Sequence, residues 1–354
     1  MRVGLDATPL LGARTGVGRY TLSLLTALQA YDDELVATAF TFRGRGALSG
    51  VVPRGVRVAA RPAPARALQA AWARTHFPPV ELLAGRLDVF HATNFVLPPL
   101  RRARGVVTVH DLSYLHHTDM VTAASARYRT LVPRSLERAA VVVTPSNAVA
   151  EQVRTEYDVK VPIVVTPLGV DPAWFDAAAP DDALRAALGL PTTYLLFVGT
   201  LEPRKDLRTL LAAHALLPDA PPLVLVGPPG WGDQVDVSGC ITTGYLDDFR
   251  LRAVVAGAAA LVLPSLDEGF GLPLLEALAA GTPVVASDLP VLREVGGSAA
   301  SYAASASPEA FADAMEQVLA SPGDSRRGPE QAATFTWARC ADRTREAYRL
   351  ALQG

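Results

Sequence analysis

Short runs of β-branched and other apolar residues alternate along the whole chain with longer segments rich in alanine and leucine. Each run is apolar at consecutive positions, which is typical of a parallel strand buried on both faces, and the longer segments have the length of helices. The predicted strands are residues 2–5, 36–42, 56–60, 88–91, 106–109, 141–144, 163–166, 194–198, 223–226, 241–243, 261–263 and 283–286. This alternation fills the length of a doubly wound domain twice, and it predicts an α/β fold with two Rossmann-like halves.

The break between the two halves is expected in residues 168–191, where prolines, acidic residues and alanines mix between two predicted strands. We therefore predict an N-terminal domain over residues 1–170 and a C-terminal domain over residues 171–335. Apolar residues return at helical spacing near the end of the chain. This spacing predicts a helix over residues 336–354, which we expect to pack back on the N-terminal domain.

Two stretches in the second half carry no predicted helix or strand. Residues 321–329 are rich in glycine, proline, serine and arginine, a composition that predicts a loop. Residues 298–306 are rich in alanine, and we assign no structural meaning to this composition.

The composition narrows the classes of protein that this chain can belong to. With 354 residues, 50% apolar and 19% charged, it can bury a full core, which excludes a disordered chain, a disulfide scaffold and a collagen-like repeat. Cys240 and Cys340 have no C-x-x-C or Cys/His spacing, which indicates a reducing compartment and no structural metal. Asp6 interrupts the only stretch that could begin an export signal, and the longest uncharged apolar run, residues 253–264, is shorter than the roughly 20 residues of a spanning helix. We therefore expect a cytoplasmic protein.

The charge is distributed unevenly along the chain. Residues 1–170 hold 20 basic and 12 acidic residues, a net charge of +8, whereas residues 171–354 hold 13 and 23, a net charge of -10. A basic first half suits an anionic acceptor or peripheral contact with the inner face of a membrane, and a solvated basic face without any partner explains the charge equally well. No nucleic acid partner is expected.

The most specific stretch is PSLDEGFGLPLLEALAAGTPVVAS, residues 264–287. A glycine-containing loop follows a buried strand here, and a helix is predicted to begin near Pro273. The amides of the loop and of the helix N-terminus would converge at the carboxyl end of a parallel strand, which is a place for a phosphate. Glu268 in the loop and Glu276, expected in the first helical turn, flank this point. Isolated acids with this spacing are usually surface residues, but the glycines and the buried strand around them favour a binding site.

Three weaker candidates also follow predicted strands. Arg204 and Lys205 come after residues 194–198, although an isolated pair of this kind is usually a solvated basic pair. His110 comes after residues 106–109, where a structural histidine and a chemical one are equally compatible with the sequence. Gly16 and Gly18 are expected in a loop, whose simplest explanation is a turn that needs glycine.

The 264–287 stretch resembles the E-x7-E signature of the retaining glycosyltransferases of family 4. Seven further stretches match that family in the same order, namely GVGRYTLSLLTAL, FHATNFVLPP, VTVHDLSYL, VVVTPSNAVAEQV, FVGTLEPRKDLRTLLAAHALL, LVLVGPPGWGD and TGYLDDFRLRAVVAGAAALVLPS. The resemblance extends over nearly the whole chain. It implies the GT-B fold, in which two Rossmann-like domains face a central cleft, with the acceptor on the N-terminal side and the nucleotide sugar on the C-terminal side.

The resemblance also implies roles for the residues of the signature. Glu276 would accept hydrogen bonds from the ribose hydroxyls of the donor, and Glu268 would lie near hydroxyls of the transferred sugar. The amides around Phe270, Gly271 and Leu272 would bind the donor phosphates.

Outside the signature, the resemblance implies that Arg204 and Lys205 bind the diphosphate and stabilise the charge that develops there. His110 would contact the transferred sugar at the reacting face. The loop with Gly16 and Gly18 would approach the donor phosphate and the acceptor.

Two features bear on metal use and on the match to the family. Asp206 stands where relatives commonly carry asparagine, which would add a negative charge near the phosphates. The sequence has no acidic D-x-D at a strand end, and its histidines show no metal-ligand spacing, so we expect a transfer reaction without a metal or other cofactor.

The function expected from this resemblance is transfer of a hexose from a nucleotide diphosphate donor to a hydroxyl of a glycan or lipid-linked glycan, with retention at the anomeric carbon. The matching stretches most resemble bacterial mannosyltransferases of surface-polysaccharide assembly. We therefore expect GDP-mannose as the donor, with UDP- or dTDP-linked hexoses as the next candidates. Both a front-face route and a double displacement stay open. A sugar-nucleotide epimerase of the same architecture and a non-catalytic nucleotide-sugar-binding protein are the alternatives.

Overall fold

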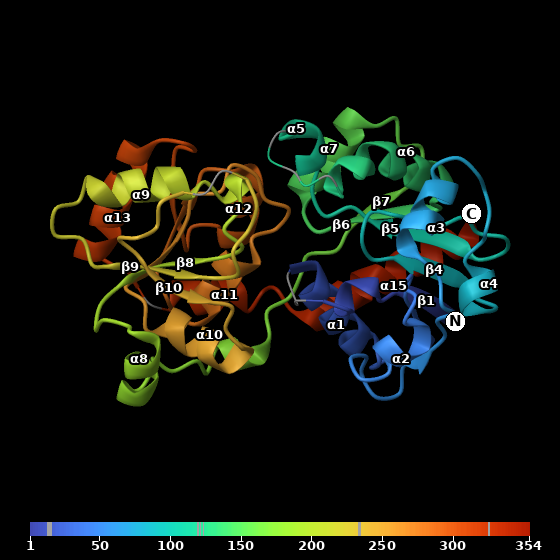
Figure 1. The fold of residues 1–354 in the computed structure, drawn as a ribbon, viewed down its shortest axis with the longest axis horizontal. Coiled ribbons are helices and arrows are strands. Elements are labelled where there is room, and N and C mark those ends of the chain that lie inside the picture. The colour runs from blue at the N-terminus through green and yellow to red at the C-terminus, as the bar shows by residue number, and fades with distance from the viewer. Residues whose placement is uncertain (13–15, 119, 121, 123, 233–234, 325) are drawn as a thin grey trace. The chain divides into compact units, whose positions relative to one another are not determined.

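The computed structural model describes every residue except 13–15, 119, 121, 123, 233–234 and 325. The chain divides into two compact units, one formed by Met1–Gly169 with Thr336–Gly354 and the other by Val170–Phe335. Each unit has a parallel sheet with helices packed on it (Figure 1). The predicted α/β fold class with two Rossmann-like arrangements is confirmed.

The first unit contains a sheet of seven described strands in the order β3-β2-β1-β4-β5-β6-β7, and all neighbouring strands are parallel. Their bounds are β1 Arg2–Asp6, β2 Glu34–Thr38, β3 Arg57–Val58, β4 Val89–Ala92, β5 Arg104–Thr108, β6 Val141–Thr144 and β7 Ile163–Val165. Each lies in or overlaps a predicted strand. The second strand begins earlier and ends earlier than predicted, because Phe40 follows it and packs into the core instead of extending the ladder.

The second unit contains a sheet of six described strands in the order β10-β9-β8-β11-β12-β13, again with parallel neighbours. Their bounds are β8 Leu195–Val198, β9 Leu223–Val226, β10 Ile241–Gly244, β11 Ala260–Leu263, β12 Val284–Ser287 and β13 Ser301–Ala303. β13 lies in the alanine-rich stretch to which no element was assigned, and that interpretation was wrong. Of its three residues only Tyr302 favours a strand, and pairing with β12 makes the segment one.

Helices connect the strands in both units (Figure 1). In the first unit they are η1 Thr8–Leu10, α1 Gly16–Leu28, α2 Gly44–Leu48, α3 Ala65–Trp72, α4 Glu81–Ala84, α5 Ser113–His116, η2 Ser125–Arg127, α6 Tyr128–Arg138, α7 Asn147–Glu156 and α15 Trp337–Gln353. In the second unit they are η3 Pro172–Trp174, α8 Asp182–Leu188, η4 Pro203–Lys205, α9 Leu207–Ala215, α10 Asp248–Ala256, α11 Leu272–Ala279, α12 Pro290–Gly296, α13 Pro308–Ala320 and α14 Arg327–Ala332. The loop predicted over 321–329 is therefore too long, because α14 begins at Arg327.

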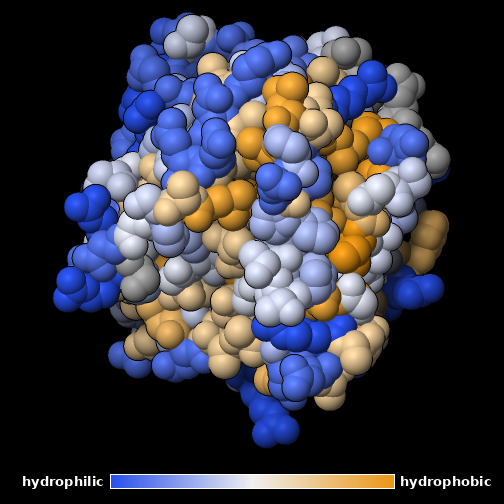
Figure 2. All heavy atoms as spheres, turned by 90° about the vertical axis from the view of Figure 1, so that its left-hand side faces the viewer, coloured by the Kyte–Doolittle hydropathy of each residue, from blue (hydrophilic) through white to orange (hydrophobic). Residues whose placement is uncertain are grey.

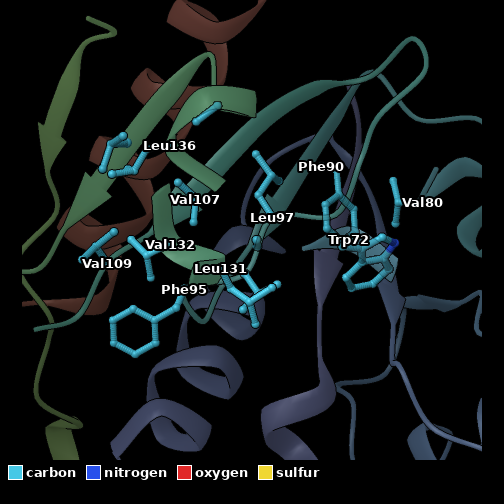
Figure 3. Close-up of a cluster of buried hydrophobic side chains, with 14 of the residues drawn as sticks. Trp72, Val80, Phe90, Phe95, Leu97, Val107, Val109, Leu131, Val132 and Leu136 are labelled. Carbon is cyan, nitrogen blue, oxygen red and sulfur yellow. The ribbon is translucent and has the colours of Figure 1, made fainter. Parts of the chain in front are cut away.

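The core of the first unit is formed by apolar side chains from the strands and from the helices that cover them (Figure 3). The labelled members are Trp72, Val80, Phe90, Phe95, Leu97, Val107, Val109, Leu131, Val132 and Leu136. All ten are at least nine-tenths buried. The consecutive apolar residues of the strands thus have helices to pack against, as the sequence pattern requires.

The surface of the second unit mixes hydrophilic and hydrophobic side chains on the face seen in Figure 2. Large apolar side chains that are exposed in this unit are Phe175, Leu216, Trp231, Tyr245 and Phe249. Among the described residues of the whole chain, none of the helices has the length and apolar character needed to cross a bilayer.

The C-terminal helix α15 belongs to the first unit, where it contacts α1, β5 and β6. The Tyr348 hydroxyl lies 2.8 Å from Nδ1 of His91, and Nε2 of that histidine lies 2.7 Å from Oγ1 of Thr108. All three side chains are buried. Burial lowers the pKa of His91 to about 3, so the ring is neutral and can donate one of these bonds and accept the other. The helix is therefore held by a series of buried hydrogen bonds as well as by apolar packing.

Tyr348→Phe should lower the free energy of unfolding by about 1–3 kcal/mol, because a buried imidazole nitrogen loses its partner. Urea denaturation monitored by fluorescence measures the change. Tyr31→Phe is the control, since its hydroxyl bonds Asp342 at the surface and its loss should matter much less. Equal effects of the two substitutions would contradict the structural role given to His91.

Candidate active site

In each sheet the strand order reverses at one pair of neighbouring strands, between β1 and β4 in the first sheet and between β8 and β11 in the second. Ligands of open parallel sheets bind outside the carboxyl ends of the strands at such points. Arg204 and Lys205 lie in η4, after β8, and Glu268 lies in the loop after β11. The second sheet thus brings these three predicted residues to its own reversal point.

The three side chains form one ionic cluster. Nζ of Lys205 lies 2.5 Å from Oε1 of Glu268, and Nη1 of Arg204 lies 3.6 Å from Oε2 of the same carboxylate. The Arg204 guanidinium also donates to the Glu202 carboxylate at 2.8 Å and to the backbone carbonyl of Asp267 at 2.6 Å. Two positive and two negative charges are therefore held together, and the bonds to Arg204 fix the direction of its guanidinium.

Burial and charge act in opposite directions on Glu268. Burial by itself raises its pKa, but the charges of Lys205 and Arg204 and hydrogen bonds from Lys205 and Ser265 hold the pKa below its usual value. The Ser265 hydroxyl donates to Oε1 at 2.8 Å. Glu268 is therefore ionised at neutral pH and acts only as a hydrogen-bond acceptor.

Glu202 and Ser265 were not among the predicted site residues. Glu202 stands two positions before Arg204, and the contact between them depends on the short turn of η4, which no strand or helix period reveals. Ser265 stands three positions before Glu268, in a loop. The one signal in the sequence was the position of the acidic Glu202 close to the predicted basic pair, and such a signal is weak evidence for a site residue.

Close backbone approaches fix the loops that carry this cluster. Gly227, after β9, has φ of +148°, and a Cβ there would lie 1.9 Å from the carbonyl oxygen of Gly199, after β8. Gly232 has φ of +88°, and a Cβ there would lie 2.4 Å from the side chain of Pro203 in η4. The loop with Trp231 and Gly232 therefore packs against the turn that carries Arg204, and only glycine fits at positions 227 and 232.

The E-x7-E stretch continues from the ionic cluster into α11. Gly271 is the N-cap, with φ of +91°, and as a glycine it has no side chain that could cap the amides of the first turn. Phe270 is buried and packs edge-on against Phe335, with ring centroids 5.8 Å apart. Glu276 is buried in α11, but in the second turn and not the first, because the helix begins at Leu272 and Glu276 is its fifth residue.

Asp206 has a local structural role. It adopts the left-handed conformation with φ of +47°, which aspartate and asparagine tolerate better than most residues. Its carboxylate caps α9, accepting the Thr209 amide at 3.3 Å and the Thr209 hydroxyl at 2.6 Å. The carboxylate expected to repel the phosphates is thus hydrogen-bonded to its own helix.

His110 is buried in the first unit, two residues after β5. Its Nε2 lies 2.8 Å from the carbonyl oxygen of Thr93, and the rings of Tyr20 and Phe95 pack edge-on against it at 5.0 and 5.7 Å. Burial lowers its pKa below the usual value, so the ring is neutral at pH 7. Because a carbonyl only accepts, Nε2 carries the proton and Nδ1 is left as an acceptor.

Gly16 and Gly18 lie in the first turn of α1, so their expected place in a loop was wrong. The helix begins at Gly16 because the sequence after it repeats apolar residues at helical spacing, and Tyr20, Leu24 and Leu28 form its buried face. Gly16 is exposed and Gly18 is buried.

The second unit thus brings together Arg204, Lys205 and Glu268 and leads from them into the helix that holds Glu276. The remaining predicted site residues, Gly16, Gly18 and His110, lie in the first unit. Within the described part of the chain, no three His, Cys, Asp or Glu side chains are grouped so that they could hold a metal ion.

Two family profiles match the chain. The profile described as Glycosyltransferase Family 4 matches residues 14–174, and the one described as Glycosyl transferases group 1 matches residues 192–321. The O-antigen chain mannosyltransferase B of Escherichia coli is 32% identical over 283 residues, which is 74% of this chain and 74% of that protein. The D-inositol 3-phosphate glycosyltransferase of Mycolicibacterium gilvum is 37% identical over 195 residues, 49% of this chain and 43% of that protein.

Solved structures with similar folds include the sucrose-phosphate synthase of Thermosynechococcus elongatus. It superposes with a TM-score of 0.77 at 21% identity, over 99% of this chain and 98% of that one. The predicted resemblance is confirmed by these matches, and the chain belongs to the family 4 glycosyltransferases, enzymes with the GT-B fold.

Proposed function

We propose that the enzyme transfers mannose from GDP-mannose to a hydroxyl of a glycan or lipid-linked glycan, with retention of the anomeric configuration. The buried cluster of Arg204, Lys205 and Glu268 at the reversal point of the second sheet is the observation that supports this most. The mannosyltransferase relative supports the choice of sugar and of acceptor.

The cluster suits the charge changes of the reaction. Negative charge develops on the diphosphate as its bond to the sugar breaks, and Arg204 and Lys205 supply fixed positive charges for it. Glu202 and Glu268 keep the two cations oriented before the donor arrives. The N-terminus of α11 adds partial positive charge at the same edge of the sheet. With this set of donors, we propose that the transfer is independent of metal ions.

For retention we favour the front-face route. In it the departing phosphate oxygen takes the proton of the acceptor hydroxyl while the new glycosidic bond forms on the same face of the sugar. A double displacement needs a carboxylate free to attack the anomeric carbon. Glu268, the carboxylate expected near the sugar, is bound by Lys205, Arg204 and Ser265, which lowers its nucleophilicity.

Release of the nucleoside diphosphate tests the proposed reaction against its two alternatives. A transferase releases it much faster when an acceptor is present and forms a new glycoside. An epimerase releases it, with a changed sugar, without any acceptor. A binding protein releases none at an enzymatic rate, and either of the last two results would refute the transferase.

The donor base is tested by thermal denaturation with GDP, UDP, dTDP and ADP at equal concentration. We expect GDP to raise the melting temperature most, because a ligand of the native state stabilises it by RT ln(1 + [L]/Kd). A clearly larger shift with UDP or dTDP would refute GDP-mannose as the donor and leave the transferase intact.

A further inference from the structure

A pocket of about 130 Å³ opens in the first unit at the reversal point of its sheet. Asp6, the last residue of β1, and Asn94, two residues after β4, form one side of it. Gln69 and Trp72 of α3 form another. In the first sheet, this pocket therefore occupies the position that the ionic cluster occupies in the second.

Three aromatic side chains, those of Phe40, Trp72 and Tyr128, give the pocket apolar walls. Phe40 and Trp72 pack edge to face with ring centroids 4.9 Å apart, and the Trp72 indole N–H donates to the Pro78 carbonyl at 3.0 Å. The Tyr128 ring lies on the Phe95 ring at 4.6 Å. Trp72 and Phe95 belong to the buried cluster of Figure 3, so the core itself holds these walls in place.

The polar groups of the pocket are acceptors and amides. The Asp6 carboxyl accepts the Thr8 amide at 2.9 Å, and Asn94 hydrogen-bonds the Tyr128 hydroxyl. The described residues that line the pocket include no lysine, arginine or histidine. A carboxylate accepts hydrogen bonds and amides both donate and accept, so together they suit a ligand with several hydroxyls. A phosphate monoester is mostly a dianion at neutral pH, and the carboxylate repels it.

The volume limits what can enter. A cavity of roughly 150 Å³ holds a six-membered ring the size of benzene. At about 130 Å³ and open to solvent, this pocket can take up at most one ring, with its substituents pointing outward. A mostly apolar pocket with a few placed polar groups is the usual form of a small-ligand site.

The pocket adjoins the residues that hold His110. The Thr93 hydroxyl donates to the Asp6 carbonyl at 2.6 Å, and the Thr93 carbonyl accepts from His110 at 2.8 Å. Phe95 contacts both the Tyr128 ring of the pocket and the His110 ring. A ligand in the pocket would therefore lie close to the side chain expected at the reacting face.

We propose that this pocket binds the terminal sugar ring of an uncharged acceptor, with Asp6, Gln69 and Asn94 bonding its hydroxyls and the apolar walls of the pocket contacting its ring. This proposal rests on the proposed function and adds to that function the class of acceptor. The enzyme then uses a neutral glycoside in preference to a phosphorylated acceptor such as an inositol phosphate.

The test uses the full chain with GDP-mannose and two sets of acceptor probes. The neutral probes are the alkyl α-glycosides of mannose, galactose, glucose and N-acetylglucosamine, and the anionic ones are D-inositol 3-phosphate and mannose 6-phosphate. At least one neutral glycoside should be mannosylated, with a lower KM than either phosphate. Asp6→Asn and Ala65→Phe, which fills the pocket from α3, should each raise that KM at least tenfold.

Ala67→Phe is the matched control, because Ala67 lies on the exposed side of the same helix. It should leave the acceptor KM unchanged. In this control the donor KM and the slow hydrolysis of donor without acceptor should also stay within twofold of the parent, since Ala67 lies outside the pocket.

Several results would overturn the proposal. The first is an unchanged acceptor KM in both pocket variants, and the second is a preference for a phosphorylated probe. The third is a parent enzyme that hydrolyses the donor but does not glycosylate any neutral glycoside and does not bind one in saturation-transfer NMR. Failure of the proposed function looks different, because the parent would then neither bind GDP nor hydrolyse GDP-mannose.

A stability measurement shows that Asp6→Asn has removed the intended charge. Burial raises the pKa of the Asp6 carboxyl to about 6, whereas an unfolded aspartate titrates near 3.9. The folded protein thus binds the proton more tightly, and the parent loses stability as the pH rises from about 4 to 6. Burial keeps the nearby His91 and Tyr128 neutral there. The variant should melt at a higher temperature than the parent above pH 6, and the difference should vanish toward pH 4.

Discussion

Lys205→Ala should lower kcat by about 100-fold, the usual loss when one fixed charge at a developing anion is removed. The ammonium group is placed by Glu268, at 2.5 Å, and by the close approach of the loops after β8 and β9. Because it stabilises charge that appears only as the donor bond breaks, the KM for the donor should change much less than kcat. Steady-state kinetics with varied donor separates the two constants.

The control for this variant is Lys160→Ala. Lys160 is the other lysine of the chain, and its exposed side chain pairs with Asp158. It should leave both constants unchanged. A rise in KM at constant kcat in Lys205→Ala would show that this residue binds the donor uniformly and does not act on the leaving group.

Loss of Lys205 also leaves the buried Glu268 with one partner fewer, which destabilises folded proteins by several kcal/mol when a buried pair is broken. The double variant Lys205→Met/Glu268→Gln removes both charges and should recover much of that stability. Its kcat should stay low, and recovery of kcat along with stability would refute a direct role for Lys205.

Glu276→Ala should weaken binding of the nucleoside diphosphate by about 10- to 100-fold. Each hydrogen bond to a charged group contributes roughly 1.5–3 kcal/mol, and the buried carboxylate is expected to accept bonds from the ribose hydroxyls. Isothermal titration calorimetry with GDP measures the loss. Glu316→Ala, an exposed helix position on α13, is the control and should bind GDP as the parent does. Equal affinity of Glu276→Ala and the parent would remove Glu276 from the nucleotide site.

The apolar strands were predictable because each carries its own signal. A run such as LLFV in β8 is buried on both faces, and all four of its residues are apolar, so the sequence itself indicates a buried strand. β13 has no such signal, since its residues become a strand only by pairing with β12. Likewise, Gly16 and Gly18 were interpreted as part of a turn. The helical spacing of the apolar residues after them instead favours a helix that begins at Gly16.

The candidate site was predictable where chemistry coincides with a strand end. Arg204, Lys205 and Glu268 each follow an apolar strand, and the parallel sheet brings such positions to one edge. The partners that orient them depend on loop geometry. The Glu202 contact requires the turn of η4, and the bond from Arg204 to the Asp267 carbonyl requires the path of a second loop. In the sequence, only the position of Glu202 two residues before Arg204 hints at these contacts, and that signal is weak.

The helix α15 has a consequence for the order in which the enzyme acquires its structure during synthesis. The first unit is complete only when α15 places Tyr348 on His91 and Arg345 on Asp33, whereas the second unit is one continuous segment, Val170–Phe335. At ribosomal rates of 5–20 residues per second, residues 170–354 follow the rest of the first unit by roughly 10–40 s. Of the two units, the first is therefore the later to finish, and until α15 is made the apolar surface that it covers on α1, β5 and β6 stays open to solvent.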